Sequence, residues 1–106
     1  MKIAAVVMAL AGLSVTLGAQ AADSGEDLIK KNGCTACHAI DKKVVGPAYI
    51  EVAAKYKGDA SAPAKLMDKV KKGGSGVWGQ VPMPPNPQVK DDDLKVMITY
   101  VLALKK

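Results

Sequence analysis

The short motif CTACH, residues 34–38, restricts this chain more than any other feature of its sequence. C-x-x-C-H is the covalent attachment motif of c-type haem. Two cysteines three positions apart on a helical turn can reach two neighbouring vinyl groups, and the next residue then presents an imidazole under the iron. The motif therefore predicts one covalently attached haem c, held by Cys34 and Cys37, with His38 as an axial iron ligand.

Three other kinds of site also use closely spaced cysteines. A thioredoxin-like redox site requires a βαβ context, and no strand pattern is found after residue 21. A structural zinc site usually takes four Cys or His ligands, whereas the chain has two cysteines and one histidine. A structural disulfide would leave the adjacent histidine without a role. Haem attachment explains the motif best, and a thiol–disulfide oxidoreductase is kept as an alternative function.

The first 21 residues read as an export signal. Lys2 supplies the positive charge, Ile3 to Gly18 form an uncharged apolar stretch, and Ala19 to Ala21 form an A-x-A cleavage site. A permanent anchor is the alternative, but the stretch is short for a membrane span of ~20 residues. We therefore expect a cleaved signal peptide over residues 1–21, a single domain over residues 22–106, a periplasmic location and no stable membrane insertion after cleavage.

The composition of the remaining domain favours a bound group and acidic partners. The chain has no Phe, one Trp and three Tyr, and a domain this small often needs a cofactor to complete its core. All 15 basic residues are lysines, and removal of Lys2 leaves 14 against 10 acidic residues, a net charge of +4. That charge favours acidic partners. The absence of arginine and of a basic–aromatic stripe argues against nucleic-acid binding.

Four helices are predicted from apolar periodicity and end signals. The first has Asp23 as its N-cap, with Glu26 three residues later, and ends near Asn32 and Gly33. The second lies within residues 47–58. The third begins after Ser61 as N-cap and ends at Gly73–Gly74, and the fourth follows the acidic run of residues 91–93.

An irregular segment from Gly73 to about Val89 separates the last two helices. Its stretch VPMPPNP, residues 81–87, contains four of the six prolines and cannot be a helix interior or central strand. Because His38 is the only histidine, the second axial position must be filled by methionine or another donor, or be open. Met83 lies in no periodic pattern, whereas Met67 and Met97 lie on apolar helix faces as core residues. We therefore assign Met83 as the second ligand.

The segments NGCTACHAID, VGPAY and GVWGQVPMPPN together resemble the small bacterial class I cytochromes c of the c-551 and c-552 type. The resemblance covers residues 23 to 106. It implies an all-α class I cytochrome c fold, with about four to five short helices around one covalently bound haem. It also implies four supporting roles. The Pro47 carbonyl accepts a hydrogen bond from the His38 imidazole, Trp78 reaches a haem propionate, Asn86 lies near the methionine sulfur, and Lys69 lies near the propionates.

The chain departs from that family's pattern near its last helix. The segment NPQVKDDD is one residue longer than the commonest form, and Lys90 stands where a capping serine is usual. We therefore expect Asp91 to be the N-cap. Tyr100 stands where tryptophan is frequent.

These observations predict a periplasmic electron carrier and not an enzyme. Two axial protein ligands would leave the iron without an open position; an enzyme or gas binder would need Met83 absent or displaceable. By resemblance, the donor is a quinol-oxidising complex or another cytochrome, the acceptor is a nitrite reductase, terminal oxidase or peroxidase, and the protein is a monomer. The residues expected to pack the haem are Val44, Val45, Val52, Leu66, Val70, Val77, Val81 and the last helix. The candidate docking lysines at its exposed edge are Lys30, Lys31, Lys42, Lys43, Lys71 and Lys72.

Overall fold

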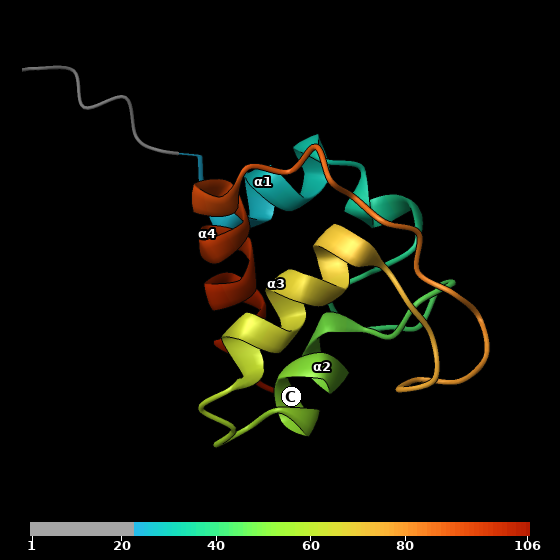
Figure 1. The fold of residues 1–106 in the computed structure, drawn as a ribbon. Coiled ribbons are helices and arrows are strands. Elements are labelled where there is room, and N and C mark those ends of the chain that lie inside the picture. The colour runs from blue at the N-terminus through green and yellow to red at the C-terminus, as the bar shows by residue number, and fades with distance from the viewer. Residues whose placement is uncertain (1–22) are drawn as a thin grey trace, which may run out of the picture.

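The computed structural model describes residues 23–106, which form helices joined by loops (Figure 1). In chain order the elements are α1 (Gly25–Lys31), the 3-10 helix η1 (Cys34–Ala36), α2 (Tyr49–Lys55), α3 (Ala62–Lys72) and α4 (Asp91–Leu102). Two isolated bridges, His38 with Lys43 and Gly74 with Met83, are the only strand-like pairing in the described part of the chain. The prediction of an all-α fold is confirmed.

The expected signal peptide, residues 1–21, lies outside the described residues. Its cleavage therefore stays a prediction. Between residues 23 and 106, no helix is both long enough and apolar enough to cross a membrane.

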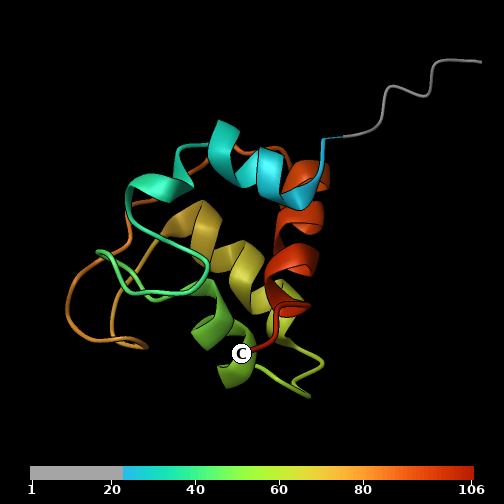
Figure 2. The same cartoon turned by 180° about the vertical axis from the view of Figure 1, so that it is seen from behind.

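Helix α4 is the element on which the other α-helices pack, since it contacts α1, α2 and α3. Its buried side chains are Leu94, Met97, Ile98 and Val101. This spacing places them on one face of the helix, as the periodicity predicted. Figures 1 and 2 both show α1 lying across one end of α4. Their close approach requires glycine at position 25, because a Cβ there would lie 2.3 Å from Cβ of Tyr100.

The N-cap of α1 differs from the prediction by one residue. Ser24 is the N-cap, and its hydroxyl accepts a hydrogen bond from the Asp27 amide at 3.2 Å. Asp23 instead pairs with Lys31 at 3.5 Å on the surface. Ser24 has the extended backbone that an N-cap needs. The choice between two adjacent good capping residues therefore depended on backbone geometry that the sequence pattern does not reveal.

The predicted side-chain caps of α3 and α4 were also wrong. Ser61 occupies the N-cap position of α3 but makes no capping hydrogen bond. Its amide and hydroxyl instead donate to the Asp59 carboxylate, at 2.8 and 2.6 Å. The N-cap of α4 is Lys90, without a side-chain cap, and Asp91 is already the first helical residue. Asp91 still lies where an acidic side chain favours the helix dipole.

The segment from residue 73 to residue 89, here called the methionine loop, connects α3 to α4 without a helix. It begins at Gly73, whose φ of 72° is in the left-handed region. A Cβ on Gly73 would lie 2.4 Å from the Met83 carbonyl oxygen, so the loop folds back tightly onto its own start. Near its other end, the backbone amide of Asn86 donates a hydrogen bond to the Val70 carbonyl of α3 at 2.8 Å. The loop therefore packs on its own start at Gly73 and is hydrogen-bonded to α3 on its returning arm.

Candidate functional site

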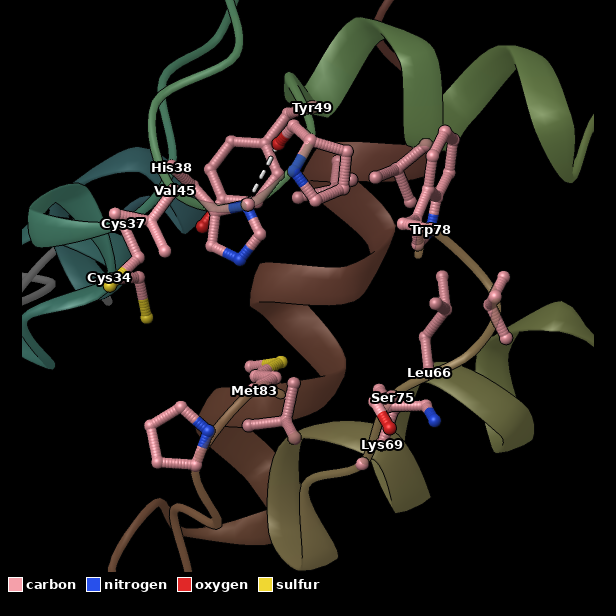
Figure 3. Close-up of a pocket in the computed structure, with 18 of the residues that line it drawn as sticks. Cys34, Cys37, His38, Val45, Tyr49, Leu66, Lys69, Ser75, Trp78 and Met83 are labelled. Atoms are coloured by element: carbon pink, nitrogen blue, oxygen red, sulfur yellow. Dashed lines mark hydrogen bonds between the residues drawn. The ribbon is translucent and has the colours of Figure 1, made fainter. Parts of the chain in front are cut away.

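The CTACH motif lies in a tight turn at the end of α1. Gly33, with φ of 74°, turns the chain out of α1, and η1 follows immediately. The amides of Cys37 and His38 both donate to the Cys34 carbonyl, at 3.2 and 3.0 Å. This turn brings both cysteines and His38 to one wall of a pocket (Figure 3). The helical-turn geometry expected from the motif is present.

The His38 ring is fixed by three neighbours. Its Nδ1 lies 2.8 Å from the Pro47 carbonyl oxygen, the contact that the resemblance implied. It stacks on Tyr49, with ring centroids 4.9 Å apart, and a Cβ on Gly46 would lie 2.4 Å from its Cε1. A carbonyl can only accept, so Nδ1 must donate in this contact, and in the neutral imidazole Nε2 is then the nitrogen with the lone pair. Figure 3 shows Nε2 turned toward the pocket, where it can bind a metal.

Met83 lies on the opposite side of the pocket from His38, with its sulfur turned inward (Figure 3). Its backbone is held by a reciprocal pair of hydrogen bonds with Gly74, at 2.8 and 3.0 Å. Pro82, Pro84 and Pro85 flank it and restrict the backbone on both sides. The loop thus offers a soft thioether donor from a restrained position.

The pocket between these walls is large and mostly apolar. Its empty space, which includes open solvent at its mouth, is about 1080 Å³. Of the side chains expected to pack a haem, six line it: Val45, Val52, Leu66, Val70, Val77 and Val81. Val44 was also expected to pack the haem, but it is not among the residues that line the pocket.

Two polar side chains also reach this pocket as expected. Trp78 lines it, and the Lys55 ammonium lies 5.5 Å from the centre of the Trp78 ring. Lys69 lines it as well, with its Nζ against the methionine loop, where a Cβ on Gly74 would lie only 2.7 Å away. Sequence reasoning missed Lys55 and the stacking of Tyr49. Neither contact leaves a sequence signal, because each joins residues through the fold.

Met97 is the one other methionine in the pocket lining. Its side chain belongs to the buried core of α4 and is 3% exposed. Its sulfur lies 3.9 Å from the amide nitrogen of Asn32. This burial fits the core role expected for Met97 and leaves Met83 as the loop-borne thioether.

The ionisation of Cys34 bears on what the two cysteines can do. Burial raises the pKa of the Cys34 thiol, and its neighbour Tyr49 also has a pKa raised by burial. A reactive dithiol needs the thiolate and hence a lowered pKa. The surroundings of Cys34 therefore disfavour thiol–disulfide exchange. They do not oppose a thioether, which carries no titrating proton.

The donors and the shape of the pocket fit a haem. One wall offers two thiols and an imidazole oriented by the Pro47 carbonyl, the opposite wall offers a thioether, and the space between is mostly apolar. A structural zinc site is not supported, because no group of three or more His, Cys, Asp and Glu among residues 23–106 could hold a metal ion.

Comparison with known proteins decides the family. A family model described as cytochrome c matches residues 22–105. The chain belongs to the cytochrome c family. It binds one covalently attached haem c and is a small haem electron carrier.

Similar proteins define the type of cytochrome. The chain is 54% identical over 77 residues to cytochrome c-551 of Allochromatium vinosum, covering 73% of this chain and 82% of that one. It is 51% identical over 94 residues to cytochrome c-551 of Pseudomonas aeruginosa, covering 89% and 88%. A crystal structure of Nitrosomonas europaea cytochrome c552 matches with a TM-score of 0.73 and 52% identity, over 76% of this chain and 99% of that one. This cytochrome is therefore of the small bacterial class I type.

Asn86 of the cytochrome is held by its own loop, and its expected role beside the Met83 sulfur stays a prediction. Its side-chain amide donates to the Pro84 carbonyl at 3.0 Å, and Asn86 is outside the pocket lining. Among the described residues, no hydrogen bond joins this amide to the Met83 sulfur. In this structure Asn86 braces the turn that follows Met83, through both its side chain and its backbone amide.

The candidate docking lysines fall into two groups. Lys30, Lys31, Lys71 and Lys72 each pair with a carboxylate of the cytochrome itself. Lys42 and Lys43 are exposed in the loop after His38, and within residues 23–106 neither forms an ion pair. Of the six candidates, Lys42 and Lys43 therefore have the charges most available to a partner.

Proposed function

We propose that this cytochrome is a periplasmic carrier that passes one electron at a time between respiratory redox proteins through a His38- and Met83-ligated haem c. The observation that carries the proposal is the opposition of His38 and Met83 across one mostly apolar pocket (Figure 3). When bound, haem supplies reversible one-electron chemistry at its iron. The residues of the chain would hold the group, complete its ligation and limit its contact with water.

In this proposal Cys34 and Cys37 hold the haem through two thioether bonds, and His38 binds the iron through Nε2. The hydrogen bond from Nδ1 to the Pro47 carbonyl at 2.8 Å keeps the imidazole oriented and increases its basicity. Met83 would bind from the opposite side, and His/Met ligation raises the reduction potential.

Residues at the mouth of the pocket complete the proposed site. Trp78 and Lys69 are available to the propionates, because both line the pocket and both have a hydrogen-bond donor. The role of Asn86 is to brace the loop that carries Met83. With both axial positions filled by protein, a substrate would have no open position on the iron, which favours a carrier over an enzyme or gas binder.

Location and partners follow from charge and from the N-terminal sequence. Cleavage after Ala21 would release the domain into the periplasm as a monomer. Exposed Lys42 and Lys43 beside the pocket would favour encounters with acidic surfaces that weaken as salt rises. The proposed donor is a quinol-oxidising complex or another cytochrome. The proposed acceptor is a nitrite reductase, terminal oxidase or peroxidase.

Spectroelectrochemical titration of the protein purified from the periplasmic fraction tests this function. We expect a single reversible one-electron couple, a haem that stays attached after denaturation, and a mass that lacks residues 1–21. A two-electron couple without haem absorption would instead indicate a dithiol oxidoreductase. An oxidised iron that binds added ligand without displacing a protein ligand would indicate an open enzymatic site.

A further inference from the structure

One lysine joins the two ends of the methionine loop. Lys71 lies in the last turn of α3, and its ammonium donates a hydrogen bond to the Val89 carbonyl at the far end of the loop. The same ammonium pairs with Asp91, at the first position of α4, at 2.9 Å. The loop leaves α3 two residues after Lys71 and returns to the same side chain.

The environment of Lys71 differs from that of the other paired lysines. Its side chain is 29% exposed, whereas the other five lysines in ion pairs are 59% to 76% exposed. Its carbonyl acceptor belongs to Val89, which is 2% exposed and packs in the core. A hydrogen bond from a charged donor in such surroundings stabilises more than an exposed surface pair.

Among residues 23–106, no other side chain forms both a hydrogen bond and an ion pair at this end of the loop. The N-cap of α4, Lys90, makes no side-chain capping hydrogen bond. The returning arm is also joined to α3 by a hydrogen bond from the Asn86 backbone amide to the Val70 carbonyl at 2.8 Å. Met83 lies between the two arms, and in the described part of the chain its backbone pairs with Gly74 on the departing arm.

We propose that Lys71 is a positioning residue that keeps the methionine loop closed and thereby keeps Met83 on the iron. This inference rests on the proposed ligation by Met83. Lys71 itself need not touch the haem, since it is absent from the pocket lining. Its effect is on the fraction of molecules in which the loop is open and the Met83 position is free.

Binding of imidazole to the oxidised holoprotein measures that fraction, because an added ligand can bind only when Met83 has left. The apparent affinity is the intrinsic affinity multiplied by the open fraction. Replacement of Lys71 by methionine removes the charged donor at similar length. We expect Lys71→Met to bind imidazole about tenfold more tightly, the scale of losing one charged hydrogen bond. Lys71→Arg, which keeps charge and donors, should restore much of the wild-type behaviour.

Two controls separate positioning from loss of charge or of overall stability. Lys72→Met removes the neighbouring charge, which makes only an exposed pair with Asp68 at 2.9 Å, and should leave imidazole affinity unchanged. Leu28→Val weakens the core at α1, outside the pocket lining, and should lower the urea midpoint without a tenfold gain in affinity. If Lys71→Met folds poorly, Asp91→Asn provides the milder variant, with a smaller increase in affinity.

Two negative results have different meanings. If wild-type protein lacks the weak red sulfur-to-iron charge-transfer band, Met83 is not the ligand, and both this inference and the proposed ligation fail. If the band is present but Lys71→Met and Asp91→Asn bind imidazole as the wild type does, the positioning role of Lys71 alone is refuted. The same holds if Leu28→Val or Lys72→Met raises the affinity as much as Lys71→Met does.

Discussion

At the scale of single residues, the site depends on how tightly His38 is enclosed. The ring has a carbonyl at Nδ1, a stacked Tyr49 on one side and the backbone of Gly46 in close contact. The motif alone predicted that His38 would be a ligand, and the resemblance implied Pro47. Nothing in the spacing indicated Gly46, because its importance comes from the space that the ring occupies.

Gly46→Ala should therefore disturb the proximal ligand. A Cβ at this position would lie 2.4 Å from Cε1 of His38, so the ring must shift. Overpacking of this kind destabilises by about 1–3 kcal/mol. We expect a lower urea midpoint and a changed haem absorption spectrum in the oxidised protein.

Gly33→Ala is the matched control for that substitution. Gly33 also adjoins the motif and has φ of 74°, but no atom lies within 4 Å of where its Cβ would be. The Gly33→Ala variant should have a lower urea midpoint because of backbone strain, and its haem spectrum should be unchanged. A normal spectrum in Gly46→Ala would show that the contact with His38 is not restrictive.

At the scale of elements, helix interiors were predictable and helix starts were not. Apolar periodicity located the buried face of α4 because four side chains share one contact surface. The caps were missed because neighbouring polar residues compete for one position, as Asp23 and Ser24 do at α1. The ion pair between Lys71 and Asp91 was also not predicted, because it joins the two ends of a loop whose path the sequence does not specify.

Lys90→Ser should stabilise α4. Lys90 has the extended backbone of an N-cap, with φ of −67° and ψ of 142°, but makes no side-chain capping hydrogen bond. A serine hydroxyl can satisfy a free amide of the first turn, worth about 1 kcal/mol. The urea midpoint should rise for Lys90→Ser and not for Lys95→Ser in the helix interior. Equal midpoints for wild type and Lys90→Ser would contradict this explanation.

The element junctions also predict how stability depends on pH. A hydrogen bond from the Ser61 hydroxyl lowers the pKa of Asp59, and a hydrogen bond from Lys71 lowers the pKa of Asp91, both from an ordinary value of 3.8. Because the pKa of each carboxyl is lower in the folded state than in the unfolded state, its contribution to the free energy of unfolding is fully present above the unfolded pKa. This contribution is lost as pH falls through the lowered folded pKa.

Urea unfolding at a series of pH values measures this effect. The wild-type midpoint should fall as the pH is lowered below about 4. Asp59→Asn and Asp91→Asn should each flatten that fall. Asp91 is exposed and Asp59 is partly exposed, so solvent screens both carboxylates and each effect should be small. A variant with the full wild-type slope would show that its carboxylate does not contribute.

At the scale of the whole molecule, the pocket occupies the place where a larger domain would have aromatic core residues. The chain has no Phe, and the described residues surround a pocket with a mostly apolar lining. Composition predicted that a large apolar group was needed, and the motif predicted which group. The sequence pattern did not show that Val44 lies outside the pocket lining, because periodicity does not specify which way a loop side chain points.

Removal of the haem should therefore abolish the compact fold. Without the group, the apolar lining of the pocket is exposed to water, and a domain of this size has little other core. We expect the apoprotein, prepared as Cys34→Ala/Cys37→Ala without haem, to lack near-UV circular dichroism and cooperative thermal unfolding. Cooperative unfolding of that apoprotein would show that the helices form a core alone.

The most direct test of the central claim is the sulfur-to-iron charge-transfer band of the oxidised protein. We expect the band in the wild type and in Met67→Ala, because Met67 packs against the core and is outside the pocket lining. We expect the band to be absent in Met83→Ala, together with a lower reduction potential. A band that persists unchanged in Met83→Ala, or that is missing from the wild type at neutral pH, would contradict ligation by Met83.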